Sequence, residues 1–138
     1  MKYLSCLVIS LTLFAVGASA RPSDDTGVRA DTSLHFYFSD MGGSVVVEVK
    51  DPDNFSACES LRNHLEQLTQ MFEDGRIGTR SIKKLRNAIR FSFQETPAGG
   101  RIVIESYDRY TVAAIHTFLE HEIETNKTGD SIMLRDSR

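Results

Sequence analysis

The sequence predicts an α+β domain in which a duplicated ββα unit forms a four-stranded antiparallel sheet with two helices packed on one face. Three observations predict this fold. Apolar and polar residues alternate in several short segments, as in half-buried strands. Two longer segments repeat apolar residues every three or four positions, as amphipathic helices do. The order strand, strand, helix occurs twice along the chain.

The first twenty residues are typical of a secretory signal peptide. Lys2 supplies a positive charge, residues 4–16 form an uncharged apolar run, and residues 18–20 read Ala-Ser-Ala, a small-residue cleavage site. The apolar run is shorter than the roughly 20 residues that span a bilayer, which favours a signal peptide over a stable membrane anchor. We therefore expect a secreted or periplasmic protein with a signal peptide, a flexible leader and a single α+β domain at residues 1–20, 21–32 and 33–138.

The first half begins with a predicted β-hairpin. Apolar residues alternate over 34–39, a β-branched run covers 44–50, and Gly-Gly lies between them as the expected turn. A helix follows as far as Glu73, with Asp51 or Asp53 as its N-cap. Its predicted inner stripe consists of six residues, Phe55, Cys58, Leu61, Leu65, Leu68 and Phe72.

The second half repeats this order. We expect a short helical turn, a strand, a second strand after another Gly-Gly turn, and a helix at residues 81–86, 89–94, 101–107 and 109–125. Ser81 and Asp108 are the expected N-caps. The predicted inner stripe of the last helix is Val112, Ile115, Leu119 and Ile123.

The halves, at about 33–75 and 88–130, also match in detail. The matched features are Phe36 with Phe91, the two Gly-Gly pairs, Glu48 with Glu105, Asp51 with Asp108, and Leu61 and Leu65 with Ile115 and Leu119 after three residues are dropped. One hairpin with one helix buries too little area to fold alone, so both halves are expected to share one sheet.

The outer face of that sheet is the first candidate for a functional surface. Tyr37, Val46 and Val103 are predicted to lie on it. An uncovered face would bind a partner, a ligand or a second copy, whereas residues 76–88 or the C-terminal tail would otherwise cover it.

The net charge limits the classes of partner, and the cysteine content predicts the role of Cys58. The net charge of −3 becomes −4 when Lys2 leaves with the signal peptide, which argues against nucleic acid as a partner. One local basic segment remains, with Arg80, Lys83, Lys84, Arg86 and Arg90, and is either a solvated surface or a site for an acidic partner. Cys58 is then the single cysteine, and its place on the inner stripe predicts a buried apolar role.

Histidines are the candidate metal ligands. His64 and His116 lie at the edges of the two helical stripes, and His35 lies on the first strand, a set that suits Zn²⁺ or Cu²⁺. The alternative for each is a histidine at the core boundary that bonds a backbone carbonyl. No HExxH, Cys-His cluster, GxSxG or phosphate loop occurs in the chain, so the sequence leaves any cofactor unknown.

Several motifs resemble a family of small secreted or periplasmic bacterial proteins of unknown function. They are Leu61-Arg62-Asn63-His64-Leu65, Met71 to Gly75, Lys84 to Ile89, Glu95 to Ile102, Ala114 to Leu119, and Thr128-Gly129-Asp130. Family members are often labelled aspartate carbamoyltransferase, an enzyme that needs a longer chain and a Ser-Thr-Arg-Thr-type phosphate loop. This chain also lacks the histidine and Pro-Gly that the family has in the segment matching residues 76–81. The resemblance implies export and a single fold, and supplies no reaction.

The sequence thus favours an exported, non-catalytic binding or accessory protein that acts through the sheet face or a groove between the helices. Its ligand would be a protein or a small molecule, and a homodimer is an open alternative. The other hypotheses are a histidine-based metal-binding protein and a small hydrolase or transferase.

Overall fold

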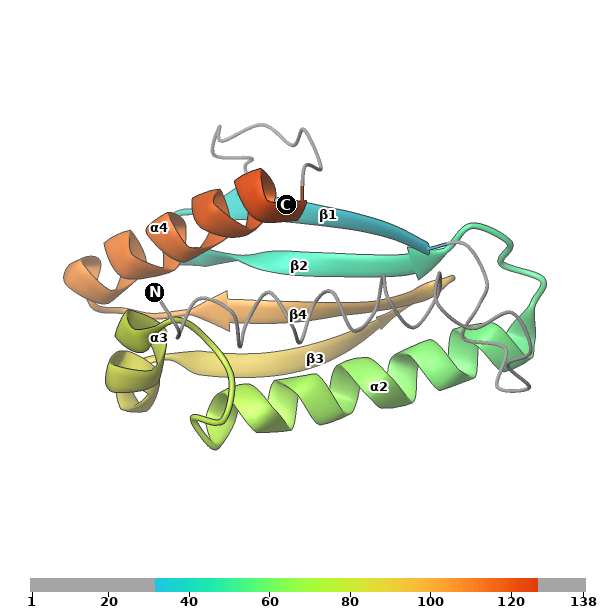
Figure 1. Ribbon diagram of the computed structural model, residues 1–138, viewed down its shortest axis with the longest axis horizontal. Coiled ribbons are helices and arrows are strands. Elements are labelled where there is room, and N and C mark those ends of the chain that lie inside the picture. The colour runs from blue at the N-terminus through green and yellow to red at the C-terminus, as the bar shows by residue number, and fades with distance from the viewer. Residues whose placement is uncertain (1–31, 127–138) are drawn as a thin grey trace.

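Residues 32–126 form a four-stranded antiparallel sheet with helices on one face (Figure 1). The computed structural model describes these residues, and the predicted signal peptide, most of the leader and the C-terminal tail lie outside them. The elements are β1 (Thr32–Ser39), β2 (Gly42–Val49), α2 (Phe55–Glu73), α3 (Arg80–Leu85), the short 3-10 helix η1 (Arg86–Ala88), β3 (Arg90–Thr96), β4 (Gly99–Glu105) and α4 (Arg109–Asn126).

The two hairpins meet at the centre of the sheet. The strand order is β1-β2-β4-β3, and all neighbours are antiparallel, so the predicted sheet is confirmed. In the central pair, Val45 lies opposite Ile102, and the register is symmetric about them, with Gly42 opposite Glu105 and Glu48 opposite Gly99.

The helices α2 and α4 cover the same face of the sheet. A Cβ atom at Gly43 of β2 would lie 2.5 Å from the Cδ1 atom of Leu119 in α4. A Cβ atom at Gly100 of β4 would lie 2.9 Å from the Cδ1 atom of Leu65 in α2. Gly43 is paired with Ile104 of β4, so the two residues face the same side of the sheet. Ile104 and Gly100 are four residues apart along β4 and therefore also face one side. Both helices thus lie on the same face of the sheet. Each helix packs mainly on the hairpin of the other half, α2 on β3 and β4, and α4 on β1 and β2.

The Gly-Gly pairs are not the hairpin turns that the sequence predicts. They open β2 and β4, and the turns consist of Asp40-Met41 and Pro97-Ala98 instead. The physical reason is close packing, because Gly43 and Gly100 lie directly beneath leucines of the opposite helix. Gly42 also has a φ of 143°, which other residues rarely adopt.

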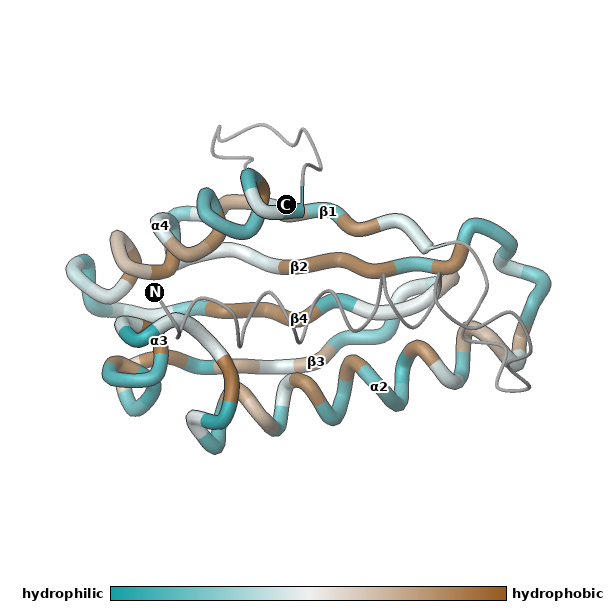
Figure 2. The backbone as a smooth tube through the Cα atoms, in the orientation of Figure 1, coloured by the Kyte–Doolittle hydropathy of each residue, from teal (hydrophilic) through white to brown (hydrophobic). Residues whose placement is uncertain are grey.

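One apolar core fills the space between sheet and helices. In Figure 2, hydrophobic residues gather on β2 and β4 and recur along one side of α2. Cys58 is buried, as predicted. Phe55 is 78% exposed, contrary to the prediction, because it is the first residue of α2 and the buried stripe starts two residues later. Val112 is only half-buried, since Thr111 takes the buried position in α4.

The cap of α2 differs from the prediction. Asn54 is the N-cap, and its side chain accepts a hydrogen bond from the Ala57 N–H at 3.1 Å. Asp51 and Asp53 form the turn before it, where the Asp51 carboxylate accepts from the Asp53 N–H. The turn uses Asp51 locally, so the aspartates do not cap the helix.

Of the other two predicted N-caps, one is confirmed and one is wrong. Asp108 caps α4 as predicted, accepting hydrogen bonds from the N–H of Thr111 at 2.9 Å and from its hydroxyl at 2.6 Å. These bonds hold the pKa of Asp108 below its usual value. Thr79, and not Ser81, caps α3, because α3 already begins at Arg80, two residues earlier than a cap at Ser81 implies.

The halves correspond closely in their backbone contacts, with one shift. Two interhairpin bonds are equivalent, Val49 N–H to Ala98 O and Ser106 N–H to Met41 O, both at 2.8 Å. Phe36 and Phe93 each lie three residues before the end of their strand, so Phe36 corresponds to Phe93 and not to Phe91 as expected. That the halves arose by duplication stays a prediction.

Candidate functional site

The three candidate metal ligands lie on three different elements. His35 is exposed on the outer face of β1, His64 is half-buried on α2, and His116 is half-buried on α4. Burial lowers the pKa of His64 and so favours its neutral form. Within residues 32–126, no group of three or more His, Cys, Asp or Glu is arranged to hold a metal ion. The metal site stays a prediction, and the described residues supply no ligand group for it.

Arg62 of α2 binds the turn of the second hairpin. Its guanidinium donates hydrogen bonds to the carbonyl oxygens of Thr96 at 2.7 Å, Pro97 at 3.2 Å and Gly99 at 3.0 Å. We call this set the first helix–turn contact. It satisfies three carbonyls at a turn and fixes α2 over β3 and β4.

His116 of α4 makes the corresponding contact with the first hairpin. Its Nε2 lies 2.9 Å from the carbonyl oxygen of Ser39, which accepts the proton that Nε2 carries. Its ring also meets that of Phe38 edge-on, with centroids 5.4 Å apart. We call this the second helix–turn contact. It agrees with the alternative of a histidine that bonds a backbone carbonyl.

The two contacts occupy equivalent positions in the halves. Arg62 and His116 are each the eighth residue of their helix. Ser39 and Thr96, whose carbonyls they bind, are each the last residue of the first strand of a hairpin. An imidazole is shorter than an arginine side chain and reaches one carbonyl where arginine reaches three. The second half therefore makes fewer hydrogen bonds at this position.

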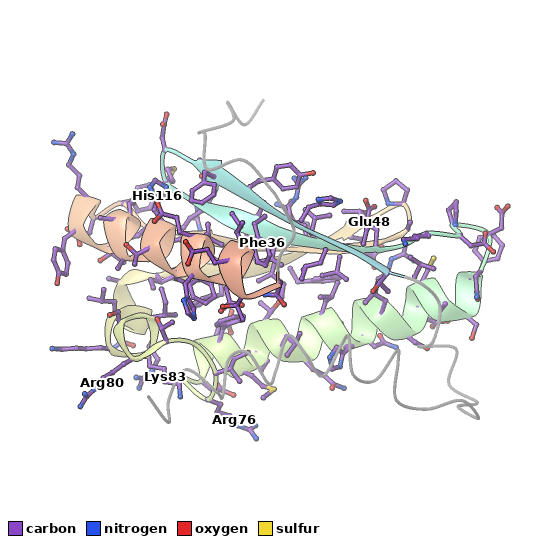
Figure 3. All side chains as sticks on the ribbon, turned by 45° about the horizontal axis from the view of Figure 1, so that its top comes forward. Phe36, Glu48, Arg76, Arg80, Lys83 and His116 are labelled. Carbon is purple, nitrogen blue, oxygen red and sulfur yellow. The ribbon has the colours of Figure 1, made fainter. Side chains whose placement is uncertain are left out.

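A pocket lies beside the second helix–turn contact, and His116 is part of its lining. It has a volume of about 380 Å³, and its wall comes from the β1–β2 turn, the β4–α4 connection and the first two turns of α4. The pocket, which we call the turn pocket, is lined by Asp40, Met41, Ser106, Tyr107, Arg109, Val112, Ala113 and His116. Figure 3 shows His116 on α4 beside the end of the sheet that forms this wall.

The lining of the turn pocket is mainly apolar and carries charges of both signs. Met41, Val112 and Ala113 supply apolar surface, while Asp40 and Arg109 are exposed. Within the described part of the chain, neither Asp40 nor Arg109 has an ion-pair partner. An unpaired acid and an unpaired base on one pocket can each bind an opposite charge on a ligand.

Exposed aromatic side chains cluster at the same end of the molecule. Tyr107 and Tyr110 are 83% and 76% exposed, and Tyr107 lines the turn pocket. The guanidinium of Arg90 lies 5.7 Å from the ring centroid of Tyr107. Large exposed aromatic rings are typical of binding surfaces, because they supply contact area at a low entropic cost.

The outer face of the sheet is less apolar than expected. Tyr37, Val46 and Val103 do lie on it, since their parity is opposite to that of the core residues. Val46 is only 6% exposed, and the large exposed hydrophobic side chains of residues 32–126 lie outside the strands. The face therefore presents mainly polar side chains among the described residues.

Two further predicted features do not form sites. Glu48 and Glu105 lie at opposite ends of the central strand pair, and Glu105 instead pairs with Arg90 at 2.8 Å. Between the helices, the rings of Phe72 and Phe118 meet at one end with centroids 6.1 Å apart. The side chains of the central strands are buried there, so the groove between the helices stays a prediction.

Glu122 is a buried acid that sequence reasoning missed. Its side chain has no exposed surface, and its Oε1 has no hydrogen-bond partner, while Asn126 donates to Oε2 at 3.2 Å. Burial raises its pKa to about 7. Leu68 has the same position in α2, so α4 has a buried acid where α2 has an apolar residue.

The chain matches no protein-family model, and no curated protein or solved structure is significantly similar to it. Among residues 32–126, no helix is both long enough and apolar enough to cross a bilayer.

Proposed function

We propose that the chain is an exported, non-catalytic binding protein whose ligand site is the turn pocket. The pattern of residues 1–20 supports export. The observation that carries the binding proposal is the pocket of about 380 Å³ beside His116, the residue that takes the place of Arg62 in the second half. Its volume lies within the range of small-molecule sites.

The lining indicates the chemistry of the ligand. Asp40 suits an ammonium group, Arg109 suits a carboxylate, and Met41 with Val112 suits an apolar side chain. A small zwitterion with an apolar side chain, such as a free amino acid or a short peptide, satisfies all three. Tyr107, at the rim, adds contact area over the bound molecule.

A ligand titration followed by NMR tests this assignment. We expect L-leucine or L-phenylalanine to shift the backbone amide signals of Met41, Ser106 and Val112 in a saturable manner. The N-acetyl amides of the same amino acids, which carry no charge, should bind at least about tenfold more weakly, because both charge pairings are lost.

Two carboxylate variants provide the matched comparison. Asp40→Asn should weaken binding, whereas Glu48→Gln at the far end of β2 should leave it unchanged. Amide shifts that are absent, or that spread over the outer face of the sheet, would contradict the turn pocket as the ligand site.

A further inference from the structure

Positive charge is concentrated in one segment of the chain. Residues 75–94 contain six Lys or Arg and no Asp or Glu. The remaining described residues, 32–74 and 95–126, contain four Lys or Arg and fourteen Asp or Glu. The protein is acidic as a whole, so this segment is a local reversal of its charge.

Five of these cations form one surface on α3 and its two flanks. We define the basic surface as Arg76, Arg80, Lys83, Lys84 and Arg86. Residues 80, 83 and 84 are spaced by three and four positions, which places them on neighbouring parts of one helix face. Figure 3 shows Arg76, Arg80 and Lys83 extending outward on the same side of the molecule. The opposite side of α3 packs inward through Ile82, which is fully buried.

The charges of the basic surface are not neutralised internally. Within residues 32–126, none of its five members forms an ion pair, whereas Arg90, at the end of the same segment, is paired with Glu105. Arg86 is held in place, because its guanidinium donates to the carbonyl of Lys83 at 3.1 Å and its side chain packs beside Gly75. An unpaired and partly ordered set of cations is suited to bind carboxylates.

We propose that the basic surface binds an acidic polypeptide segment of a partner protein, independently of the turn pocket. A short helix and its flanks present a narrow group of cations, which matches the width of one extended chain rich in Asp and Glu. Such a chain covers less of the acidic remainder of the molecule than a broad surface would. Electrostatic attraction then supplies both orientation and a fast association rate.

A flat anionic membrane fits these observations less well. It would face a wide area of the molecule, including the acidic side chains around the basic surface, within about one Debye length of 8–10 Å. The basic surface also has no large exposed apolar side chain to insert into a bilayer, since those of residues 32–126 are Phe55, Tyr107 and Tyr110.

Fluorescence polarisation of a labelled peptide tests the proposal on the purified chain. The probe is a glutamate-rich peptide, and its control is the same peptide with Gln for every Glu. We expect the Glu peptide to bind at low salt, to weaken as salt is raised, and to bind far more tightly than the Gln peptide.

Matched lysine variants locate the site. Lys84→Glu and Lys50→Glu make the same change in net charge at two exposed lysines, one on the basic surface and one after β2. Lys84→Glu should raise the Kd by about fivefold or more, while Lys50→Glu should change it by less than about twofold. Circular dichroism of both variants checks that the fold is kept.

Three results would overturn the proposal. They are equal weakening by both variants, equal binding of the Gln peptide, and binding to phosphatidylglycerol vesicles that Lys84→Glu abolishes while the Glu peptide does not bind at all. The last result would assign the basic surface to a membrane.

Discussion

The two helix–turn contacts show how one position serves two different purposes. In the first half, Arg62 donates to three carbonyls and so links α2 to the turn of the second hairpin. In the second half, His116 donates to the single carbonyl of Ser39, and the turn pocket lies beside it. The first contact has three hydrogen bonds, whereas the second has one and lies beside the pocket that we propose as the ligand site.

Among residues at equivalent positions in the two halves, Glu122 and Leu68 are expected to differ most in their effect on the free energy of unfolding. The carboxyl of Glu122 is buried, and its pKa is raised from 4.5 to about 7. The folded state therefore holds a proton that the unfolded state has released between these pH values. The contribution of Glu122 to stability is therefore largest below about pH 4.5 and is lost as pH rises through about 7, a change of about 3 kcal/mol.

Glu122→Gln should remove this loss. Denaturant unfolding of the variant and the natural chain at about pH 5 and about pH 8 measures it, and Glu124→Gln on the exposed side of α4 is the control. The same pH dependence in both variants would show that Glu122 is ionised without cost in the folded state.

The next largest expected difference in the free energy of unfolding is between variants that remove the first and the second helix–turn contact. Arg62→Ala leaves three turn carbonyls without their donor and should lower the free energy of unfolding by about 2–3 kcal/mol. His116→Ala loses one bond and should cost about 1 kcal/mol. Urea unfolding of both variants compares them directly, and equal losses would contradict the assignment of different roles.

His64 and Phe118 are expected to differ least, through the effect of mild acid on stability. Both are the tenth residue of their helix, but burial lowers the pKa of His64. The folded state therefore resists protonation, so the chain should lose stability as pH falls below about 6.5, the usual value for histidine. His64→Phe should remove this loss of thermal stability in mild acid, and an unchanged acid profile would count against it.

Much of the fold could be predicted, because it follows from local periodicity. Alternation along the strands and the stripe on α2 are set by which side chains face the core, and these patterns are readable without the structure. The N-cap residues of the helices were harder to predict from the sequence. Asn54 and the aspartates before it are all good caps, and only the geometry of the turn decides between them.

The candidate site depended on packing between distant segments. Gly43 and Gly100 were taken for turn residues, since their contact with leucines of the opposite helix is not visible locally. A signal for the turn pocket was nevertheless present. Aligning Leu61 and Leu65 with Ile115 and Leu119 places Arg62 opposite His116, and the change from a long to a shorter side chain marks where space is left.

His116→Arg tests most directly the claim that the shorter side chain creates the binding site. The variant gives the second half the residue of the first, which should contact the turn as Arg62 does and fill the turn pocket. We predict that the free energy of unfolding is kept or raised by about 1 kcal/mol, while binding of L-leucine and L-phenylalanine is lost. A folded His116→Arg variant that still binds these amino acids with the original affinity would contradict the account.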